Sequence, residues 1–287
     1  MADAPPEIFD RMRRRLRRDR AALRYADHDV IHAHMADEVL GRLDLVSRDF
    51  RDVLDLGCHG GVVARVLAGR GMNITSVDAG GRFAEAARGV QADEDRPIFA
   101  AASFDLILSV GVLDQVNDLP GALSLIRQML RPDGLFLAAF IGAGSLPRLR
   151  TAMLAADAKQ AAPRIHPQVD VRSAGDLLMR AGFALPVADG ERLTVRYRAL
   201  SGLIADLRGM GATSLLQGSP PLTRAAARRA AASFAEQADP DGRVSERFEI
   251  VHLSGWAPSP DQPKPARRGS ATASLADALK GAPPAAR

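Results

Sequence analysis

A glycine-rich segment next to an acid is the part of the sequence best suited to binding a ligand. The stretch VLDLGCHGGVV (53–63) places Asp55 two residues before Gly57, and Gly60 and Gly61 follow. Such a turn lets the backbone approach a ligand, and a helix beginning there presents free N–H groups. The spacing does not match the G-x-G-x-x-G turn that binds a dinucleotide pyrophosphate. A carboxylate at the strand end would repel a pyrophosphate and attract an ammonium group.

Two further groups of acids follow along the chain. Asp78 ends an apolar run 17 residues beyond Gly61, and the segment 92–95 (ADED) precedes the next apolar run. A carboxylate at the tip of a second strand can accept hydrogen bonds from both ribose hydroxyls. A carboxylate near 92–95 can accept one from an adenine amino group, although Glu94 and Asp95 are expected to be solvated. Together these acids suit a cationic, ribose-bearing adenine ligand such as S-adenosylmethionine.

The elements that would position these residues alternate between strands and helices. This order predicts a parallel sheet covered on both faces, an α/β fold. Expected strands span 50–58, 73–80, 104–113 and 135–142, and expected helices span 9–24, 29–48, 62–71, 82–90 and 119–134. In the helix at 9–24 the apolar residues lie roughly on one side, namely Phe9, Met12, Leu16 and Leu23. Beyond residue 145, helices are expected at 145–160, 171–183, 200–214 and 222–238, and strands at 191–197 and 247–257 that could pair as an antiparallel edge.

Five segments in order resemble the class I S-adenosylmethionine-dependent methyltransferases. They are VLDLGCHGG, VDAG, ADED, FDLILSVGVLDQVNDLPGAL and LRPDGLFLAAFIG. The resemblance implies a doubly wound, mostly parallel seven-stranded sheet of Rossmann-like type with one antiparallel strand, here with a helical cap. Further segments, among them FDRMRRRLRRDRAA, LMRAGF and LRGMGATS, are similar to the complex I assembly factor 5 (arginine-hydroxylase) group and its bacterial relatives over nearly the whole chain.

The resemblance assigns cofactor-binding roles to residues of this sequence. Asp78 would hold the ribose and Asp93 the adenine. His59 departs from the family pattern, which usually has glycine there; we expect it to be tolerated if its φ stays negative and Gly60 supplies the flexibility. The methionine end of the cofactor would lie along the first turn, at Asp55, Gly57, Cys58, His59 and Gly61.

The loop 111–118 (GVLDQVND) is where a substrate should approach, at the carboxyl ends of the strands. Family members often carry a His-Trp pair at the positions of Asp114 and Gln115, so a histidine base is absent here. Asp114 is a weak catalytic candidate, since a capping or solvated role competes, and Asn117 and Asp118 are expected to cap the next helix. We expect no metal site, because the HDVIH segment (28–32) lacks an evident third ligand.

The resemblance favours a methyltransferase-like enzyme acting on a protein, an arginine of a complex I subunit; hydroxylase activity is possible by the same resemblance. The first alternative is a malonyl-carrier-protein O-methyltransferase of the biotin-synthesis type. The second is a non-catalytic assembly factor that uses the cofactor only to stabilise its fold. The sequence leaves the accepting atom and the oligomeric state open.

Charge and composition bound the remaining possibilities. Aromatic residues make up 5% of the chain, which disfavours a nucleic-acid stacking platform, and no apolar run approaches the length of a membrane span. The single cysteine and the lack of an apolar leader favour a cytoplasmic location. Three regions are expected: N-terminal helices (1–48), a methyltransferase-like domain (49–257) with a cap insertion at about 145–235, and a flexible basic tail (258–287).

Overall fold

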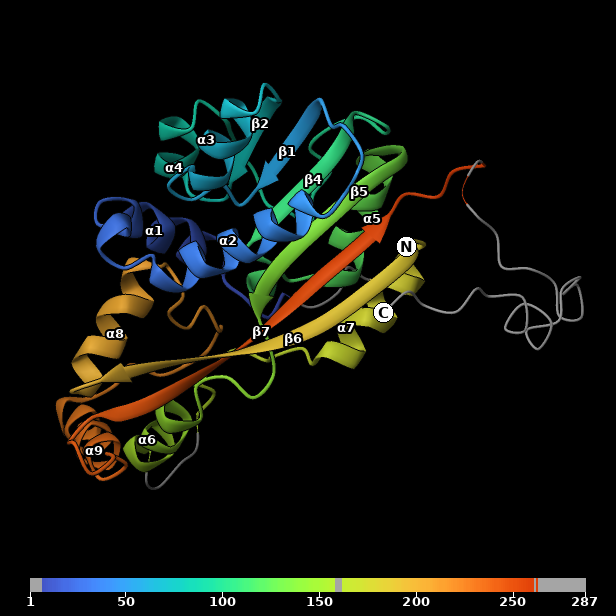
Figure 1. Ribbon diagram of the computed structural model, residues 1–287. Coiled ribbons are helices and arrows are strands. Elements are labelled where there is room, and N and C mark those ends of the chain that lie inside the picture. Colours follow the sequence, from blue (N-terminus) through green and yellow to red (C-terminus); the bar gives the residue numbers. More distant parts are fainter. Residues whose placement is uncertain (1–6, 158–161, 261, 263–287) are drawn as a thin grey trace, which may run out of the picture.

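The computed structural model describes residues 7–157, 162–260 and 262. It has a seven-stranded sheet in the order β3-β2-β1-β4-β5-β7-β6, as expected for the doubly wound methyltransferase fold (Figure 1). The predicted tail at 258–287 lies almost wholly outside these residues. Within the described part of the chain, no helix has both the length and the apolar character needed to cross a bilayer.

The first five strands are parallel and form the half of the sheet that carries the glycine-rich turn. The strand residues 52–56 and 104–110 are mostly buried, and the apolar runs predicted these two strands. Val90 and Gln91 are exposed and were not expected to form a strand, and Leu130 already begins a strand although 119–134 was expected to be helical. The strands are β1 (Asp52–Leu56), β2 (Asn73–Asp78), β3 (Val90–Gln91), β4 (Phe104–Val110) and β5 (Leu130–Ile141).

The last two strands form the antiparallel edge that the sequence suggested. β7 (Val244–Trp256) pairs antiparallel with β5 and with β6 (Ala184–Tyr197). Pairing with β5 stops at Ile250, whereas the β6–β7 pairing continues to Val244, so this ribbon extends beyond the parallel strands. Figure 1 shows the extension carrying helices at its far end.

Helices cover both faces of the sheet. α5 (Leu119–Met129) and α7 (Val171–Ala181) pack on one face, and α2 (Val30–Asp44) and α3 (Val62–Gly69) on the other. The same core as α2 also contains the cap helices α6 (Pro147–Asp157), α8 (Leu200–Gly209) and α9 (Arg224–Ala235). The expected insertion at 145–235 is therefore not one spatial unit, because α7 and β6 belong to the sheet layers.

Helix α1 (Arg11–Ala22) packs against α4 (Gly81–Ala86) with the opposite face from the one predicted. Of its supposed apolar side, only Phe9 is buried; Met12, Leu16 and Leu23 are 62, 50 and 67% exposed. Arg14 and Arg18 are buried instead. The prediction was wrong because it ranked apolar side chains above arginines, and buried acids elsewhere in the chain offset the cost of burying these arginines.

Candidate functional site

The glycine-rich turn joins β1 to α3 as predicted. Gly57 (φ 91°) and Gly61 (φ 70°) take left-handed conformations that favour glycine. A Cβ on Gly57 would lie 2.6 Å from the side chain of Val112, so the turn also needs glycine for close packing. The backbone N–H groups of Gly57 and Cys58 both donate to the carbonyl of Val77, which holds the turn against β2.

Asp55 lies at the end of β1 and is 1% exposed. Burial and the nearby charge of Asp78 raise the pKa of Asp55 to about 7, although the backbone N–H of Ala64 lowers it. That N–H belongs to the first turn of α3, so Asp55 interacts with the start of this helix as a cap residue does. Its Oδ2 has no hydrogen-bond partner in the described chain, so one acceptor is free toward the turn.

Asp78 is fully buried, and both of its oxygens are engaged. Arg18 of α1 donates from Nε to Oδ1 over 2.7 Å and also bonds Oδ2. The backbone N–H groups of His59 and Gly80 donate to the same carboxylate over 3.1 and 2.7 Å. A guanidinium therefore holds the carboxylate that was predicted to bind a ribose.

The acids at 93–95 are bound by the same helix. Arg14 contacts Glu94 through two bonds of 2.6 and 2.8 Å, and Arg11 contacts Asp95 through two bonds of 2.7 Å. Glu94 and Asp95 are buried side chains, which corrects the expectation that they are solvated. Asp93, the adenine candidate, is bonded by Arg15 over 2.7 Å. The arginines 11, 14, 15 and 18 follow i, i+3, i+4, i+7 spacing and share one helix face.

His59 fills the remaining space between β1 and β4. Its φ is +44°, so the condition under which we expected it to be tolerated, a negative φ, is not met. Its Nε2 lies 2.8 Å from the carbonyl oxygen of Val110 and its Nδ1 lies 3.1 Å from Arg18. A carbonyl only accepts, so Nε2 carries the proton and Nδ1 accepts. The ring also stacks on Tyr25 with centroids 5.3 Å apart.

The hollow left at the turn is too small for a nucleoside. It has a volume of about 20 Å³, lined by Asp55, Gly57, Cys58, His59 and Tyr25 among others, which is room for about one water molecule. The donor and acceptor set suits S-adenosylmethionine, but in this conformation the site does not fit it. The cofactor roles of Asp55, Gly57, Cys58, His59, Gly61, Asp78 and Asp93 stay a prediction.

The loop after β4 lies beside a second and much larger cavity. Asp114 lines this cavity, and burial raises its pKa to about 6. Asp118 caps α5 by accepting from Gly121 over 2.8 Å, as expected, whereas Asn117 anchors the backbone of Phe9 instead. The sequence analysis predicted neither the contact of Asn117 with Phe9 nor the arginine face of α1. The helical spacing of the arginines and the acidic run ADED were the signals from which that face could have been predicted.

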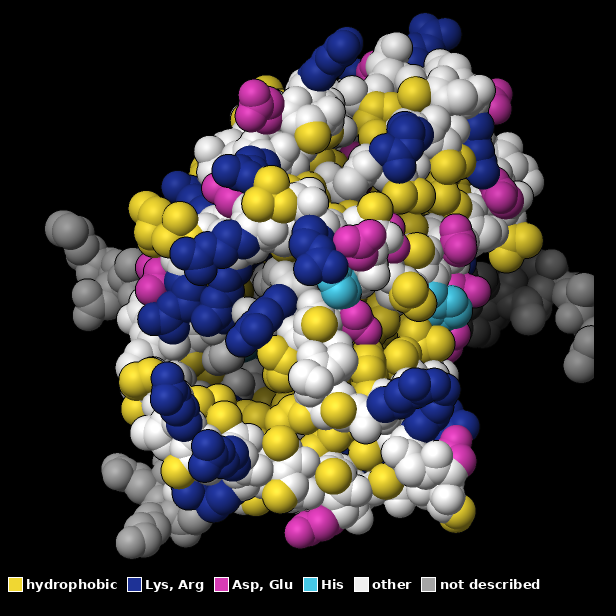
Figure 2. Space-filling view, turned by 90° about the vertical axis from the view of Figure 1, so that its left-hand side faces the viewer, with side chains coloured by type: hydrophobic (Ala, Val, Ile, Leu, Met, Phe, Trp, Pro, Cys, Tyr) yellow, Lys and Arg dark blue, Asp and Glu magenta, His cyan; other side chains and the backbone are white. Residues whose placement is uncertain are grey.

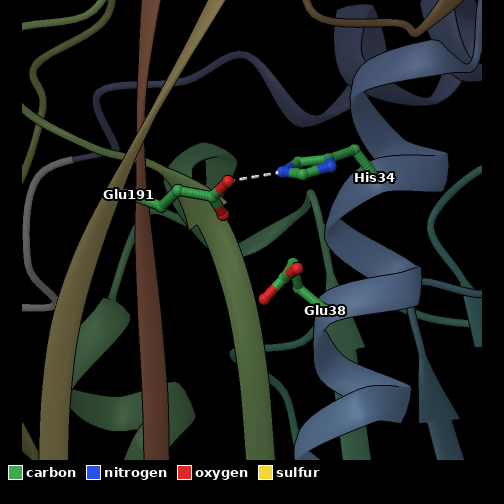
Figure 3. Close-up of side chains that lie close together, drawn as sticks. All are labelled: His34, Glu38 and Glu191. Atoms are coloured by element: carbon green, nitrogen blue, oxygen red, sulfur yellow. Dashed lines mark hydrogen bonds and ion pairs between the residues drawn. The ribbon is translucent and has the colours of Figure 1, made fainter.

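Two groups of histidines and acids have residue types that can bind a metal. His28 and His32 of the HDVIH segment diverge, since His28 bonds Asp206 and His32 bonds the Tyr25 hydroxyl. His34 and Glu38 of α2 and Glu191 of β6 do come close together (Figure 3). His34 hydrogen-bonds Glu191 over 2.8 Å on a partly exposed surface.

The sheet order, the glycine turn after β1 and the acids at the ends of β1 and β2 define the class I methyltransferase architecture, and the chain belongs to that family. Residues 5–186 match the family model described as a methyltransferase domain. The YcgJ protein of Bacillus subtilis has a similar structure, with a TM-score of 0.54 and 17% identity, covering 78% of this chain and 99% of that one.

Two groups of relatives are similar over most of the sequence. The mitochondrial arginine-hydroxylase NDUFAF5 of Danio rerio is 33% identical, covering 95% of this chain and 90% of that protein. The malonyl-[acyl-carrier protein] O-methyltransferase of Laribacter hongkongensis is 30% identical, covering 87% of this chain and 90% of that protein. The chain is therefore methyltransferase-like and similar to both groups.

Proposed function

We propose that this protein is an S-adenosylmethionine-dependent methyltransferase-like enzyme whose cofactor site is closed by α1 in the arrangement described here. The observation that carries the proposal is the pairing of one arginine face with the four acids of the cofactor region. Arg18 bonds Asp78, and Arg15 bonds Asp93. Cofactor binding requires this helix face to withdraw, since the same carboxylates cannot serve both.

The exposed face of α1 supports a second position for this helix. Met12 and Leu16 lie one turn apart and are 62 and 50% exposed, while the charged face is turned inward. An amphipathic helix that leaves its apolar stripe in water gains little hydrophobic stabilisation from its position. The helix is therefore held mainly by ion pairs, and an arrangement that buries the apolar stripe competes with it.

A protein substrate of the NDUFAF5 type is supported by the similarity over 95% of the chain. The cavity beside Asp114 counts against a guanidinium as its occupant, because its lining includes six arginines and a single carboxylate. An anionic substrate, such as the free carboxyl of a malonyl group, suits that lining better. Mass spectrometry of the candidate complex I subunit, from cells with and without this protein, tests the arginine substrate directly.

A non-catalytic assembly role is the second candidate, and the His59 ring favours it. The ring bridges β1 and β4 through Val110 and leaves only about 20 Å³ at the turn. If this packing is permanent, the fold keeps the methyltransferase architecture without the cofactor.

Calorimetry with S-adenosylmethionine on the full chain separates the two candidates. If only molecules in which α1 has withdrawn can bind S-adenosylmethionine, the apparent affinity depends on the fraction of such molecules. Destabilising the closed state by about 1.4 kcal/mol then raises the apparent affinity tenfold. Arg18→Gln should therefore bind at least about tenfold more tightly than the wild type, and Asp78→Ala should abolish binding. Arg15→Gln should give a smaller gain in a chain that stays folded, because the Arg15 side chain is 38% exposed.

Arg20→Gln is the matched control, because Arg20 lies on the same helix and, within the described chain, has no carboxylate within 4.0 Å. It should leave the affinity for S-adenosylmethionine unchanged. Absence of binding in the wild type and in both the Arg15 and Arg18 variants would reject the enzyme and leave the assembly role.

A further inference from the structure

A cavity of about 1420 Å³ lies between α1, α2 and the cap helices. This exceeds the volume of most small-molecule sites, which is about 300–1,000 Å³. Figure 2 shows this face of the molecule, with apolar side chains in a hollow and dark blue side chains beside it. The lining contains buried apolar residues, which include Ile31, Leu149, Met153, Leu207, Met210 and Phe248.

A second arginine face of α1 lines the same cavity. Arg13, Arg17 and Arg20 follow i, i+4, i+7 spacing, which places them along one side of the helix, and Arg24 lies just beyond the helix end at Ala22. Arg208 at the end of α8 also lines the cavity. These residues are distinct from the arginines that bind the acids at 78 and 93–95, so α1 presents one cationic face to each site.

The charge of this second face is poorly neutralised. Arg13 and Arg24 have only loose ion pairs on the surface, of 3.7 Å with Asp10 and 3.4 Å with Asp27. Within the described chain, none of the remaining three has a carboxylate within 4.0 Å; these are Arg17, Arg20 and Arg208.

The arginines also repel one another. Burial, together with the positive charges of Arg13, Arg20 and Arg208, lowers the pKa of Arg17. Arg17 donates instead to the uncharged carbonyl of Ser214. A group of cations that is partly desolvated and lacks counter-charges gains free energy when an anion binds.

We infer that this cavity binds an anionic amphiphile, with a long acyl chain along the apolar lining and a carboxylate or phosphate head at the arginines of α1 and α8. Both parts of the ligand follow from the lining. The apolar depth matches a hydrocarbon chain, and Arg20 and Arg208 offer planar donor groups to an oxyanion. Binding here needs no S-adenosylmethionine and stands whether or not the chain transfers a methyl group.

An acidic protein segment fits less well than a lipid chain. A helix is about 10 Å across and needs an open groove with an exposed apolar floor. The floor here is buried, with Met210 and Phe248 only 2 and 1% exposed, so it lies inside the fold. A flexible hydrocarbon chain can enter such a space, whereas a helix would need the cap to separate.

Isothermal titration of the full chain with oleate, without S-adenosylmethionine, tests the inference. Oleate should bind, and oleyl alcohol, which has the same tail and no charge, should bind far more weakly. The double variant Arg20→Gln/Arg208→Gln should weaken oleate binding by about tenfold or more, as expected for lost charged hydrogen bonds. The matched control Arg172→Gln/Arg180→Gln removes two exposed arginines of α7 and should bind like the wild type.

The variant Ala205→Trp fills the cavity from an exposed position on α8 and should block oleate. Tighter binding of oleoyl lysophosphatidate than of oleate would identify a phospholipid source, and the reverse order a free fatty acid. The inference is overturned if oleate does not bind, if the Arg20/Arg208 variant or Ala205→Trp binds it as well as the wild type, or if a poly-glutamate peptide binds and oleate does not.

Discussion

The guanidinium of Arg18 lies on the carboxylate of Asp78, with Nε 2.7 Å from Oδ1 and both side chains fully buried. These two residues are 60 positions apart and join α1 to the end of β2. The contact decides whether the carboxylate is available to any ligand. It also holds the face of α1 that carries Arg14 and Arg18 against the interior of the fold.

Removing one partner of this ion pair should lower the free energy of unfolding. Arg18→Met should lower the free energy of unfolding by about 3–5 kcal/mol, because it leaves a buried carboxylate without its counter-charge. In a double-mutant cycle with Asp78→Asn, the double variant should be destabilised by clearly less than the sum of the two single variants. Urea unfolding measures all four proteins, and additive costs would mean that the two residues do not stabilise one another.

The exposed apolar residues of α1 should contribute little to stability. Met12→Gln and Leu16→Gln should each change the free energy of unfolding by no more than about 0.5 kcal/mol, the usual size for surface substitutions. Phe9→Ala, at a residue 4% exposed, should cost about 3–5 kcal/mol. Thermal and urea unfolding of the three variants check this contrast; a large loss in Met12→Gln would place that stripe in a contact.

The parallel strands could be predicted from sequence because their signal is local. In β1 and β4, apolar residues are consecutive and both faces are buried, so a run of apolar letters is enough. The glycines at 57 and 61 likewise mark a turn whose φ values only glycine adopts freely. The antiparallel pairing of β6 with β7 followed from two strand patterns near the end of the fold.

The inward face of α1 could not be predicted in the same way. Helical periodicity gives the faces of a helix, but it does not say which face finds a partner. Arg14 is buried because it pairs with Glu94, which lies 80 residues further along the chain. No residue near Arg14 in the sequence indicates this pairing. The left-handed φ of His59 is also a tertiary effect, since the ring is held by Val110, Tyr25 and Arg18 from three other elements.

Cys58 should report on the opening of the cofactor turn. It is the single cysteine of the chain and is 4% exposed. Burial and the nearby charge of Asp78 raise the pKa of its thiol well above the usual range, and only a thiolate reacts readily with alkylating agents. Iodoacetamide should therefore label the native protein very slowly and the urea-unfolded protein rapidly.

The same reaction should respond to loosening of α1. Arg15→Gln should speed labelling of Cys58 under native conditions, because it weakens the ion pair with Asp93. Arg20→Gln, which breaks no such pair, should label at the wild-type rate. Equal rates for the two variants would show that the turn opens independently of the helix.

His32 should make the protein less stable in mild acid. It is 4% exposed, and burial together with the charge of Arg18 lowers its pKa to about 3. Its pKa in the unfolded chain is about 6.5, so below that pH the unfolded chain binds a proton that the folded chain does not. Stability from this group is complete above pH 6.5 and is lost as the pH falls toward 3. Between pH 7.5 and 5.5 the loss should be about 1.4 kcal/mol.

The variant His32→Gln should lack this contribution. Its free energy of unfolding, measured in urea at pH 7.5, 6.5 and 5.5, should fall less steeply than that of the wild type, and the difference should reach about 1.4 kcal/mol at the lowest pH. Val39→Ala, a buried change on the same helix with no titrating group, is the control for a general loss of stability and should keep the wild-type slope. If the stability of His32→Gln falls with pH as steeply as that of the wild type, the imidazole of His32 is protonated in the folded protein. Its Nδ1 could then not accept a hydrogen bond from Tyr25.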